Sequence, residues 1–245
     1  MSYDEKLGVR INKYLADAGR CSRREADRWI QEGRVLIDGH RATLGDRVTP
    51  GMKVTIEGEP VRSKIKRRYI MLNKPVGIVC TADHNEPDNV VDFVDHDDRI
   101  YPVGRLDKDS EGLLLLTNDG DIVNRILRAS EHHEKEYDVR VDKPITPEFI
   151  RQMEDGVRIL DTVTLPCKLK KTGERTFTII LTQGLNRQIR RMCEALGYNV
   201  RALRRVRIMH LRLGNLKLGQ WRNLTPTEMD ELMRQLNSGA KPGRS

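Results

Sequence analysis

The stretch Val103-Gly-Arg-Leu-Asp-Lys-Asp-Ser-Glu-Gly112, followed directly by Leu113-Leu-Leu-Leu116, places a highly charged loop against a wholly apolar run. The apolar run predicts a buried strand. A charged loop anchored on a buried strand can hold a reactive side chain rigidly. On its own, the loop is also consistent with an exposed turn closed by local ion pairs, so its role depends on the rest of the chain.

Strand-like runs recur on both sides of this stretch and alternate with helical patterns. They lie at 69–72, 113–116, 137–141 and 177–181. This order favours an α+β fold with a mixed or antiparallel sheet over a doubly wound parallel sheet. We therefore predict one domain over residues 69–237, followed by a disordered tail over 238–245.

The first part of the chain has a separate pattern that begins with two short helices. Apolar residues at helical spacing from Ile11 to Ala18 predict the first helix, which Gly19 ends. Ser22 and Glu25 have the spacing of a capping box. In such a box the hydroxyl accepts a hydrogen bond from the amide three residues later, and the carboxylate accepts one from the amide of the hydroxyl residue. A second helix is therefore expected to begin there.

Short strands are expected to follow the helix pair at 35–37 and 54–56. Together these elements predict a helix-helix-strands unit over residues 7–60. Residues 61–68 contain the basic run Lys64-Ile-Lys-Arg-Arg68 and little apolar content, which predicts a linker.

The helix pair carries a basic surface opposite its apolar face. Its basic side chains are Arg10, Lys13, Arg20, Arg23, Arg24, Arg28 and Arg34. A solvated surface would also account for them, but few acidic residues accompany the arginines, which favours contact with nucleic-acid phosphates. The formal net charge of +8 likewise suggests a polyanionic partner. A ribosome-associated structural protein would share this charge.

Three segments of this unit resemble the S4 RNA-binding domain. They are Val9-Arg-Ile-Asn-Lys-Tyr-Leu15, Cys21-Ser-Arg-Arg-Glu-Ala-Asp27 and Gly33-Arg-Val-Leu-Ile-Asp-Gly39. The RNA contacts predicted in this unit, from its basic surface, are Arg10, Lys13, Arg23, Arg24 and Arg28. S4 domains occur in ribosomal proteins, tRNA synthetases and modification enzymes alike, so the resemblance indicates the partner and not the chemistry.

A second group of arginines lies downstream, where Gln183-Gly-Leu-Asn-Arg-Gln-Ile-Arg-Arg-Met192 opens a helix that is expected to end near Gly197. On a helical wheel the apolar residues Ile189, Met192, Cys193 and Leu196 fall opposite Arg187, Arg190, Arg191 and Glu194. Arginines near a helix N-terminus oppose the helix dipole. Their position therefore predicts a phosphate or a carboxylate nearby.

The cysteines give no sign of a metal site or a disulfide framework. Cys21, Cys80, Cys167 and Cys193 are widely spaced, without a Cys-x-x-Cys pair or a cluster of histidines. We expect four reduced thiols. Because the sequence shows no apolar signal region and no apolar run of membrane-spanning length, a cytoplasmic protein is the expectation.

Three segments together resemble one enzyme family. They are Gly104-Arg-Leu-Asp-Lys-Asp-Ser-Glu-Gly-Leu-Leu114, Lys135-Glu-Tyr137 and Asn186-Arg-Gln-Ile-Arg-Arg-Met192. Their order and spacing resemble the RsuA/RluB/RluE/RluF family of pseudouridine synthases over nearly the whole chain. The RluF branch of this family, which acts on 23S rRNA, is the one most similar to three segments: Leu72-Asn-Lys-Pro-Val-Gly-Ile78, His133-Glu-Lys-Glu-Tyr137 and Gln183-Gly-Leu-Asn-Arg-Gln-Ile-Arg-Arg-Met-Cys-Glu194. The resemblance implies that the domain over 69–237 is catalytic and isomerises uridine in structured RNA.

The resemblance also implies roles for three residues. Asp107 would start cleavage of the glycosidic bond, either by attacking the uridine or by removing a sugar proton. Arg190 would pair with Asp107 and keep it ionised, since a nearby positive charge lowers a carboxylate pKa. Tyr137 would stack on the uracil and assist loss of the C5 proton.

Other residues are implied to hold the RNA. Arg105, Lys108 and Arg187 would hold the flipped nucleotide and its phosphates, because a stacked uridine must leave its helix before its glycosidic bond can be reached. The remaining predicted RNA contacts of this site are Leu106, Gln188, Ile189 and Arg191. No cofactor or metal is expected, because the isomerisation involves no net redox change or group transfer.

Two alternatives stay open at this point. The same chemistry could act on a tRNA anticodon arm or on small-subunit rRNA, because S4 domains bind structured RNA by shape. The chain could instead be a non-catalytic RNA-binding or ribosome-assembly factor, although such a protein has no use for a carboxylate among phosphate-binding arginines. A monomer is the simplest expectation for the oligomeric state.

Overall fold

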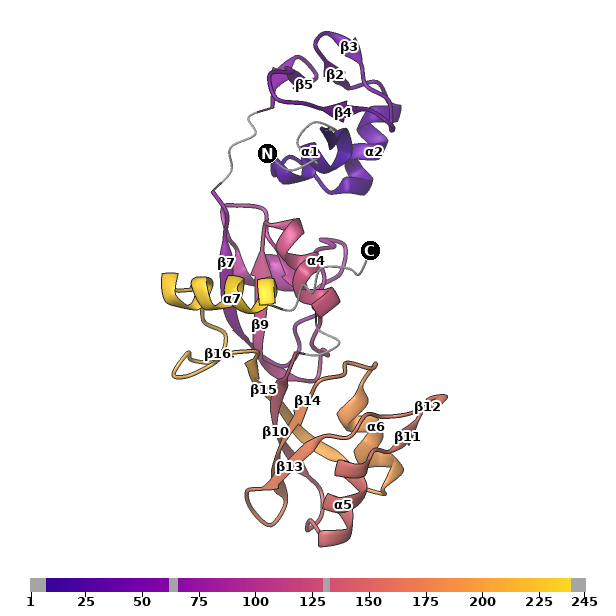
Figure 1. The fold of residues 1–245 in the computed structure, drawn as a ribbon, viewed down its shortest axis with the longest axis vertical. Helices are drawn as coiled ribbons and strands as arrows, with labels where there is room; N and C mark the ends of the chain where they lie inside the picture. Colours follow the sequence, from indigo (N-terminus) through magenta and orange to yellow (C-terminus); the bar gives the residue numbers. More distant parts are fainter. Residues whose placement is uncertain (1–7, 62–65, 130–132, 239–245) are drawn as a thin grey trace. The chain divides into compact units, whose positions relative to one another are not determined.

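Figure 1 shows the computed structural model of the chain, which describes residues 8–61, 66–129 and 133–238. The chain forms two compact units, Met1–Arg67 with Asn118–Gly120 and Arg68–Thr117 with Asp121–Ser245. Residues 62–65 of the predicted linker and 239–245 of the predicted tail lie outside the described residues. Within the described ranges, no helix has the length and apolar character that crossing a membrane requires.

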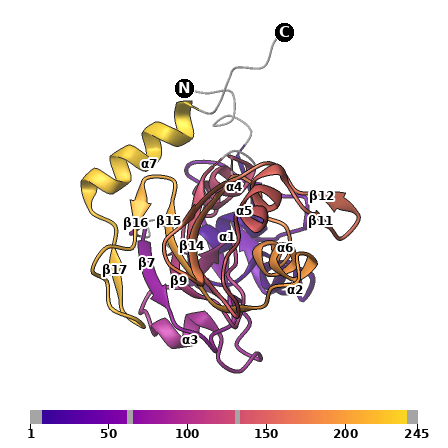
Figure 2. The ribbon, with the colours of Figure 1, turned by 90° about the horizontal axis from the view of Figure 1, so that it is seen from below.

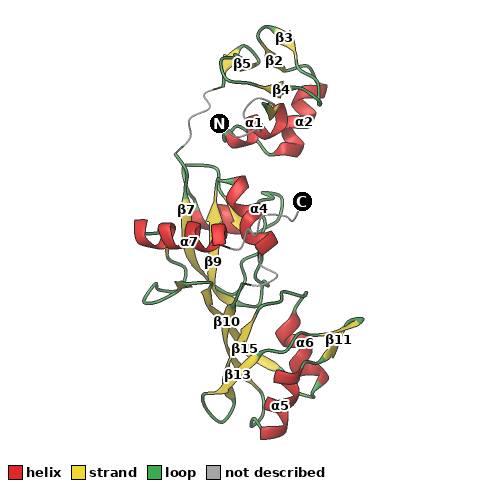
Figure 3. Cartoon of the chain, viewed as in Figure 1, coloured by secondary structure: helices red, strands yellow, loops and turns green. Residues whose placement is uncertain are grey.

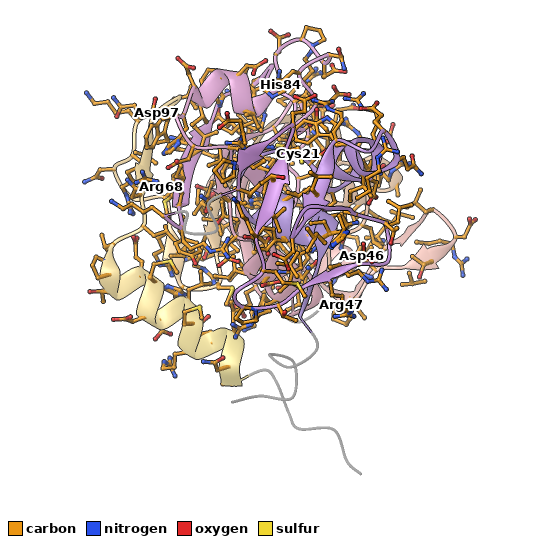
Figure 4. The ribbon with its side chains drawn as sticks, turned by 90° about the horizontal axis from the view of Figure 1, so that it is seen from above. Cys21, Asp46, Arg47, Arg68, His84 and Asp97 are labelled. Carbon is orange, nitrogen blue, oxygen red and sulfur yellow. The ribbon has the colours of Figure 1, made fainter. Side chains whose placement is uncertain are left out.

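The first unit combines two helices with short strands, as the sequence predicts. Its elements are β1 (Val9–Arg10), α1 (Ile11–Asp17), α2 (Arg23–Gln31), β2 (Val35–Ile37), β3 (His40–Arg41), β4 (Arg47–Val48), β5 (Val54–Ile56) and β6 (Glu59–Pro60). Ser22 Oγ accepts a hydrogen bond of 3.1 Å from the Glu25 amide, so this half of the predicted capping box is present. The Glu25 carboxylate lies 3.5 Å from Arg28. Cys21 is buried in the core of this unit, and Arg47 is exposed on its surface (Figure 4).

The second unit is built on one large mixed sheet. Its strands run in the order β13 (Lys168–Lys171), β14 (Thr176–Leu181), β10 (Lys135–Val141), β15 (Val200–Ile208), β9 (Glu111–Thr117), β7 (Tyr69–Lys74) and β17 (Trp221–Asn223), with β16 (Leu211–Arg212) beside β15 and β8 (Tyr101–Val103) beside β9. Neighbouring strands are antiparallel except β9 and β15, which are parallel and pair at Glu111 with Arg204 and at Gly112 with Arg205. The predicted mixed sheet is therefore confirmed.

The leucine run of β9 is buried on both faces of the sheet. Leu113 and Leu115 join a core cluster with residues of α4 (Gly120–Ala129) and α7 (Pro226–Ser238). Leu114 and Leu116 point the other way, into a cluster that includes residues of α3 (Val90–Val94). Because successive side chains of a strand alternate between faces, a strand covered on both sides must be apolar throughout. This explains why the charged loop is followed by four leucines.

Two further helices cover the other half of the sheet. α5 (Pro147–Asp155) and α6 (Gln188–Ala195) lie beside β10, β13 and β15 (Figure 3), and Phe149, Met153, Met192 and Cys193 from these helices share a core cluster with β10 and β14. The short pair β11 (Arg158–Ile159) and β12 (Thr162–Val163) projects beyond them (Figure 2). Within the residues that the structure describes, the four cysteines form no disulfide. Burial raises the pKa of Cys167 and Cys193 to about 12.

An ion pair fastens α7 to the edge strand β17 and predicts a pH dependence of stability. Arg222 donates two hydrogen bonds of 2.7 Å to the Glu228 carboxylate, and they hold the pKa of Glu228 at about 2. A carboxyl whose pKa is lower in the folded state stabilises it above the unfolded pKa, and this contribution is lost as the pH falls from about 4.5 towards 2.

Replacing Glu228 by Gln is therefore expected to lower the free energy of unfolding at pH 7 by about 1–2 kcal/mol, allowing for screening by solvent. The variant should also flatten the pH dependence of stability between pH 2 and pH 4.5, measured by chemical denaturation. If the variant had wild-type stability at pH 7 and the same pH dependence between pH 2 and pH 4.5, the ion pair would contribute nothing to the free energy of unfolding.

Candidate active site

A cavity of about 230 Å³ lies where the charged loop, β10, β15 and the start of α6 meet. All three segments that the sequence singled out contribute to its wall, through Asp107, Tyr137 and Arg187. The residues come from positions far apart in the chain, and the sheet order brings them together because β10 and β9 both flank β15. The predicted convergence of the charged loop with the distant arginine helix is thus present.

Backbone contacts fix the loop that carries Asp107. The Ser110 amide donates to the Asp107 carbonyl at 3.0 Å, which closes a tight turn. The Gly77 amide donates to the Lys108 carbonyl at 2.8 Å, and the Leu106 amide donates to Cys80 Sγ at 3.4 Å. The turn after β7 therefore supports the loop from one side, and the Asp107 side chain keeps 30% of its surface exposed.

Two arginines face the carboxylates of this loop. Arg187 makes two hydrogen bonds of 3.0 Å to Asp109, and its Nη1 lies 3.7 Å from Asp107 Oδ2. Arg190 Nε lies 4.0 Å from Asp107 Oδ2, while its Nη2 donates to the Asp109 carbonyl at 2.8 Å. Arg190 therefore lies near Asp107, as predicted, but at a longer distance than its hydrogen bond to the Asp109 carbonyl. The shorter contact holds the backbone of the loop.

Asp109 is the more tightly bound of the two carboxylates. Burial opposes its ionised form, but hydrogen bonds from Arg187 and the charge of Arg190 outweigh burial and lower the pKa of Asp109. Asp109 consequently neutralises much of the positive charge of both arginines. Asp107 lies near the same two arginines without a direct hydrogen bond from either of them.

The position of Arg187 corrects one prediction from the helical wheel. α6 begins only at Gln188, and Arg187 is its N-cap residue, with φ 49° and ψ 35°. The wheel assumed helical geometry for residues before Gln188, and it therefore placed Arg187 on the polar face. In the structure Arg187 has a left-handed conformation, and its side chain turns towards Asp109.

The other predicted RNA contacts divide into two groups. Arg105, Leu106, Gln188 and Ile189 line the cavity, and among them Arg105 is exposed. Lys108 and Arg191 are not part of the lining. Lys108 Nζ lies 3.5 Å from Asp88, and Arg191 Nε donates to the Asn186 carbonyl at 3.1 Å.

Sequence reasoning missed several basic residues of this site. Lys74 is fully buried and donates to the carbonyls of Pro75 and Ile78 at 2.9 and 2.8 Å. Lys135 and Arg205 line the cavity itself. Burial lowers the pKa of both lysines. The available signal for Lys74 was its position at the end of a strand that begins with the apolar run Ile70-Met-Leu72.

The basic surface of the first unit is more unevenly neutralised than predicted. Lys13 pairs with Asp17 at 2.6 Å, and Arg28 lies 3.5 and 3.8 Å from Glu25 and Glu32. Arg34 pairs with Glu57 at 2.8 Å. The expectation of few acidic partners is wrong for these residues. In the described part of the chain, no ion pair involves the exposed side chains of Arg10, Arg23 and Arg24.

Comparisons with known proteins match both units. The family model for RNA pseudouridylate synthase matches residues 68–195, and the S4 domain model matches residues 9–54. The chain is 54% identical to the dual-specificity RNA pseudouridine synthase RluF of Escherichia coli (strain K12), over 95% of this chain and 81% of that protein. It is 38% identical to ribosomal large subunit pseudouridine synthase B of Bacillus subtilis (strain 168), over 94% and 98% of the two chains. A crystal structure of a pseudouridylate synthase matches with a TM-score of 0.66 and 29% identity, covering 92% of this chain and 100% of that one.

Proposed function

Because the chain belongs to the RNA pseudouridylate synthase family and isomerises uridine to pseudouridine in RNA, we propose that its target is a uridine of 23S rRNA and that Asp107 starts the reaction. The observation that carries the proposal for Asp107 is its position. It is a half-exposed carboxylate on the cavity wall, 3.7 and 4.0 Å from two arginines whose hydrogen bonds go to its neighbours.

The chemistry assigned to Asp107 is the opening of the glycosidic bond. Its carboxylate either attacks the uridine or removes a sugar proton, and the bond between N1 and C1′ then breaks. The uracil rotates and its C5 bonds to C1′. In the first case the Asp107 carboxylate leaves C1′ as this bond forms, and in the second it returns the proton to the sugar. The C5 proton is then lost and N1 gains a proton. Tyr137 lines the same cavity and offers a ring on which the uracil can stack.

The cavity position of Asp107 favours base flipping. A uridine stacked in a stem cannot bring its glycosidic bond to a side chain in a cavity wall, so the nucleotide must leave the stack at a cost of a few kcal/mol. Arg105 supports this step, because it is exposed and also belongs to the cavity lining. Its cation can offset part of the flipping cost by contact with the RNA backbone.

The choice of 23S rRNA rests on the similar proteins. The Bacillus subtilis relative is named for the large ribosomal subunit, and the Escherichia coli relative is named for a dual specificity. A second RNA, such as a tRNA anticodon arm, is therefore included in the test.

Pseudouridine mapping of rRNA and tRNA tests the target. RNA from cells that lack the gene should lose pseudouridine at a 23S rRNA position, and the wild-type gene should restore it. Unchanged 23S rRNA together with a lost site in tRNA or small-subunit rRNA would refute the 23S assignment. The same cells carrying Asp107→Asn serve as the matched control, because this variant should restore no site.

The basic surface of the first unit predicts an unequal effect of two arginines on RNA binding. Arg24 has no ion pair among the described residues, whereas Arg28 is already shared between Glu25 and Glu32. Replacing Arg24 by Ala should weaken RNA binding several-fold and reduce the slope of log affinity against log salt by roughly 0.7–0.9, the value for one phosphate contact. Replacing Arg28 by Ala should give a smaller change, and turnover at saturating RNA should be unaffected in both variants. Equal slopes in all three proteins, measured by filter binding, would contradict this assignment.

A further inference from the structure

Arg205 is a buried arginine of β15 that lines the cavity, with only 4% of its surface exposed. The strand register explains how it comes to face the cavity. β10 and β15 pair Glu136 with Arg207 and then Tyr137 with Arg205, so one residue of β15 is skipped by a bulge. The bulge places Arg205 directly opposite Tyr137.

The other side of Arg205 contacts the start of β9. Arg205 pairs with Gly112 in the parallel register of β15 and β9. Its Nε donates to the Leu113 carbonyl at 2.8 Å, and its Nη1 donates to the Arg105 carbonyl at 3.3 Å. These two carbonyls stand on either side of Asp107 in the sequence. Arg205 therefore holds both ends of the loop that presents the carboxylate.

The third nitrogen of the guanidinium has a different environment. Arg205 Nη2 is buried and makes no hydrogen bond within the residues that the structure describes. A buried donor without an acceptor is unfavourable, particularly when it carries charge. A buried arginine is usually paired with carboxylates. Arg207, two residues further along the same strand, is an example, because it pairs with Glu136 at 2.6 Å and with Glu134 at 3.0 Å. Arg207 does not line the cavity.

We propose that Nη2 of Arg205 donates a hydrogen bond to a carbonyl oxygen of the uracil that enters this cavity. The inference rests on the proposed flipping of the base. When the bond between N1 and C1′ breaks, its electron pair stays on the uracil and spreads over the ring and its carbonyl oxygens. The pair is used again when C5 bonds to C1′, so no oxidant or reductant takes part.

A fixed guanidinium suits this step for two reasons. It remains charged throughout, because arginine does not lose its proton at neutral pH. It is also held by two backbone carbonyls before the base arrives, so it can stabilise the developing negative charge without reorganising. Its contact with the base should therefore be stronger in the transition state than in the bound substrate, and its loss should reduce kcat more than it raises KM.

The test combines variants of Arg205 with substrates altered at one atom. The substrate is an RNA hairpin containing the mapped target uridine, prepared with uridine, 2-thiouridine or 4-thiouridine at that position. Sulfur accepts hydrogen bonds weakly, so the two thio substrates examine the two carbonyl positions separately. The enzymes are the wild type, Arg205→Lys, Arg205→Gln and, as the matched control, Arg207→Lys.

With ordinary uridine, Arg205→Gln should lower kcat by at least roughly 10- to 100-fold, the effect of losing one charged hydrogen bond. The change also removes the hydrogen bonds to the Leu113 and Arg105 carbonyls, and the thio substrates separate this structural loss from the contact with the base. For the wild type and Arg207→Lys, kcat with one of the two thio substrates should be lower than kcat with uridine by a factor similar to that of Arg205→Gln. For Arg205→Gln, the same thio substrate should lower kcat by much less. Arg205→Lys should lie between them. If Arg205→Gln does not fold, as judged by thermal unfolding, Arg205→Lys decides the comparison in the same way.

Two results would overturn the proposal. One is a wild-type enzyme that converts both thio substrates as fast as uridine. The other is a thio effect of equal size in the wild type and in the Arg205 variants, which would make Arg205 a purely structural residue. Failure of the proposed function would look different, since an active Asp107→Asn variant would refute that proposal whatever the thio substrates show.

Discussion

Replacing Asp107 by Asn is expected to reduce pseudouridine formation by on the order of 10⁴-fold or more, because an amide can neither attack the uridine nor take up a sugar proton. The side chain keeps its size and lies 3.7 Å or more from the nearest arginine nitrogen, so the loop should stay folded. Single-turnover measurement of pseudouridine in a target hairpin gives the loss, and filter binding with the same RNA should show nearly unchanged affinity.

The control for this variant is Asp109→Asn, the same chemical change two residues away. Asp109 makes two hydrogen bonds to Arg187 and is not part of the cavity lining. Its loss should release Arg187 and lower activity by about 10-fold or less, through misplacement of the loop. If Asp107→Asn retained activity, or if Asp109→Asn were the more damaging change, the assignment of Asp107 would be wrong.

Replacing Gly112 by Ala is expected to have the largest effect on stability. Gly112 has φ +109°, and an added Cβ would lie 2.2 Å from the Arg205 carbonyl oxygen and 2.7 Å from its backbone nitrogen. Backbone strain and overpacking should together cost about 3 kcal/mol or more. Because the clash is with backbone in the parallel register of β9 and β15, it can be relieved only by separating the strands. Urea denaturation should show the loss, accompanied by falling activity.

Gly77→Ala separates the two contributions to this effect. Gly77 has a similar backbone angle, φ +97°, but an added Cβ would meet nothing within 4 Å. This variant should lose only about 1–2 kcal/mol, the cost of the backbone conformation. Similar losses in both variants would show that the close approach of Arg205 contributes little.

Much of the fold could be predicted from the sequence, because its main strands have clear patterns. The apolar runs of β7, β9 and β14 and the helix signals around Ser22 and Gly33 identify elements that the structure contains. β15 could not be found in this way. Its arginines at 201, 204, 205 and 207 resemble a basic surface segment. Two of them, Arg205 and Arg207, are buried, and their burial depends on a carbonyl of β9 and a carboxylate of β10.

The residues that gather at the cavity could be predicted in part as a set, but their arrangement could not. Sequence patterns indicate that arginines near Gln188 need an anionic partner. They do not indicate that Asp109 is the carboxylate bound most tightly, because this depends on the left-handed conformation of Arg187. Arg205 carried no motif of its own, and only the bulge between β10 and β15 turns it towards the cavity.

The parallel pairing of β9 with β15 also has a consequence for folding. It brings together residues far apart in the chain, as in the hydrogen bond between Arg205 and the Leu113 carbonyl, which spans 92 positions. Contacts of such long sequence separation close large loops and form slowly. The pairings of β10 with β14 and of β7 with β9 join residues that are closer in the chain, so they can form earlier. The loop that carries Asp107 therefore acquires its final support only when the two halves of the sheet join, so catalytic competence should be among the last properties that the folding chain gains.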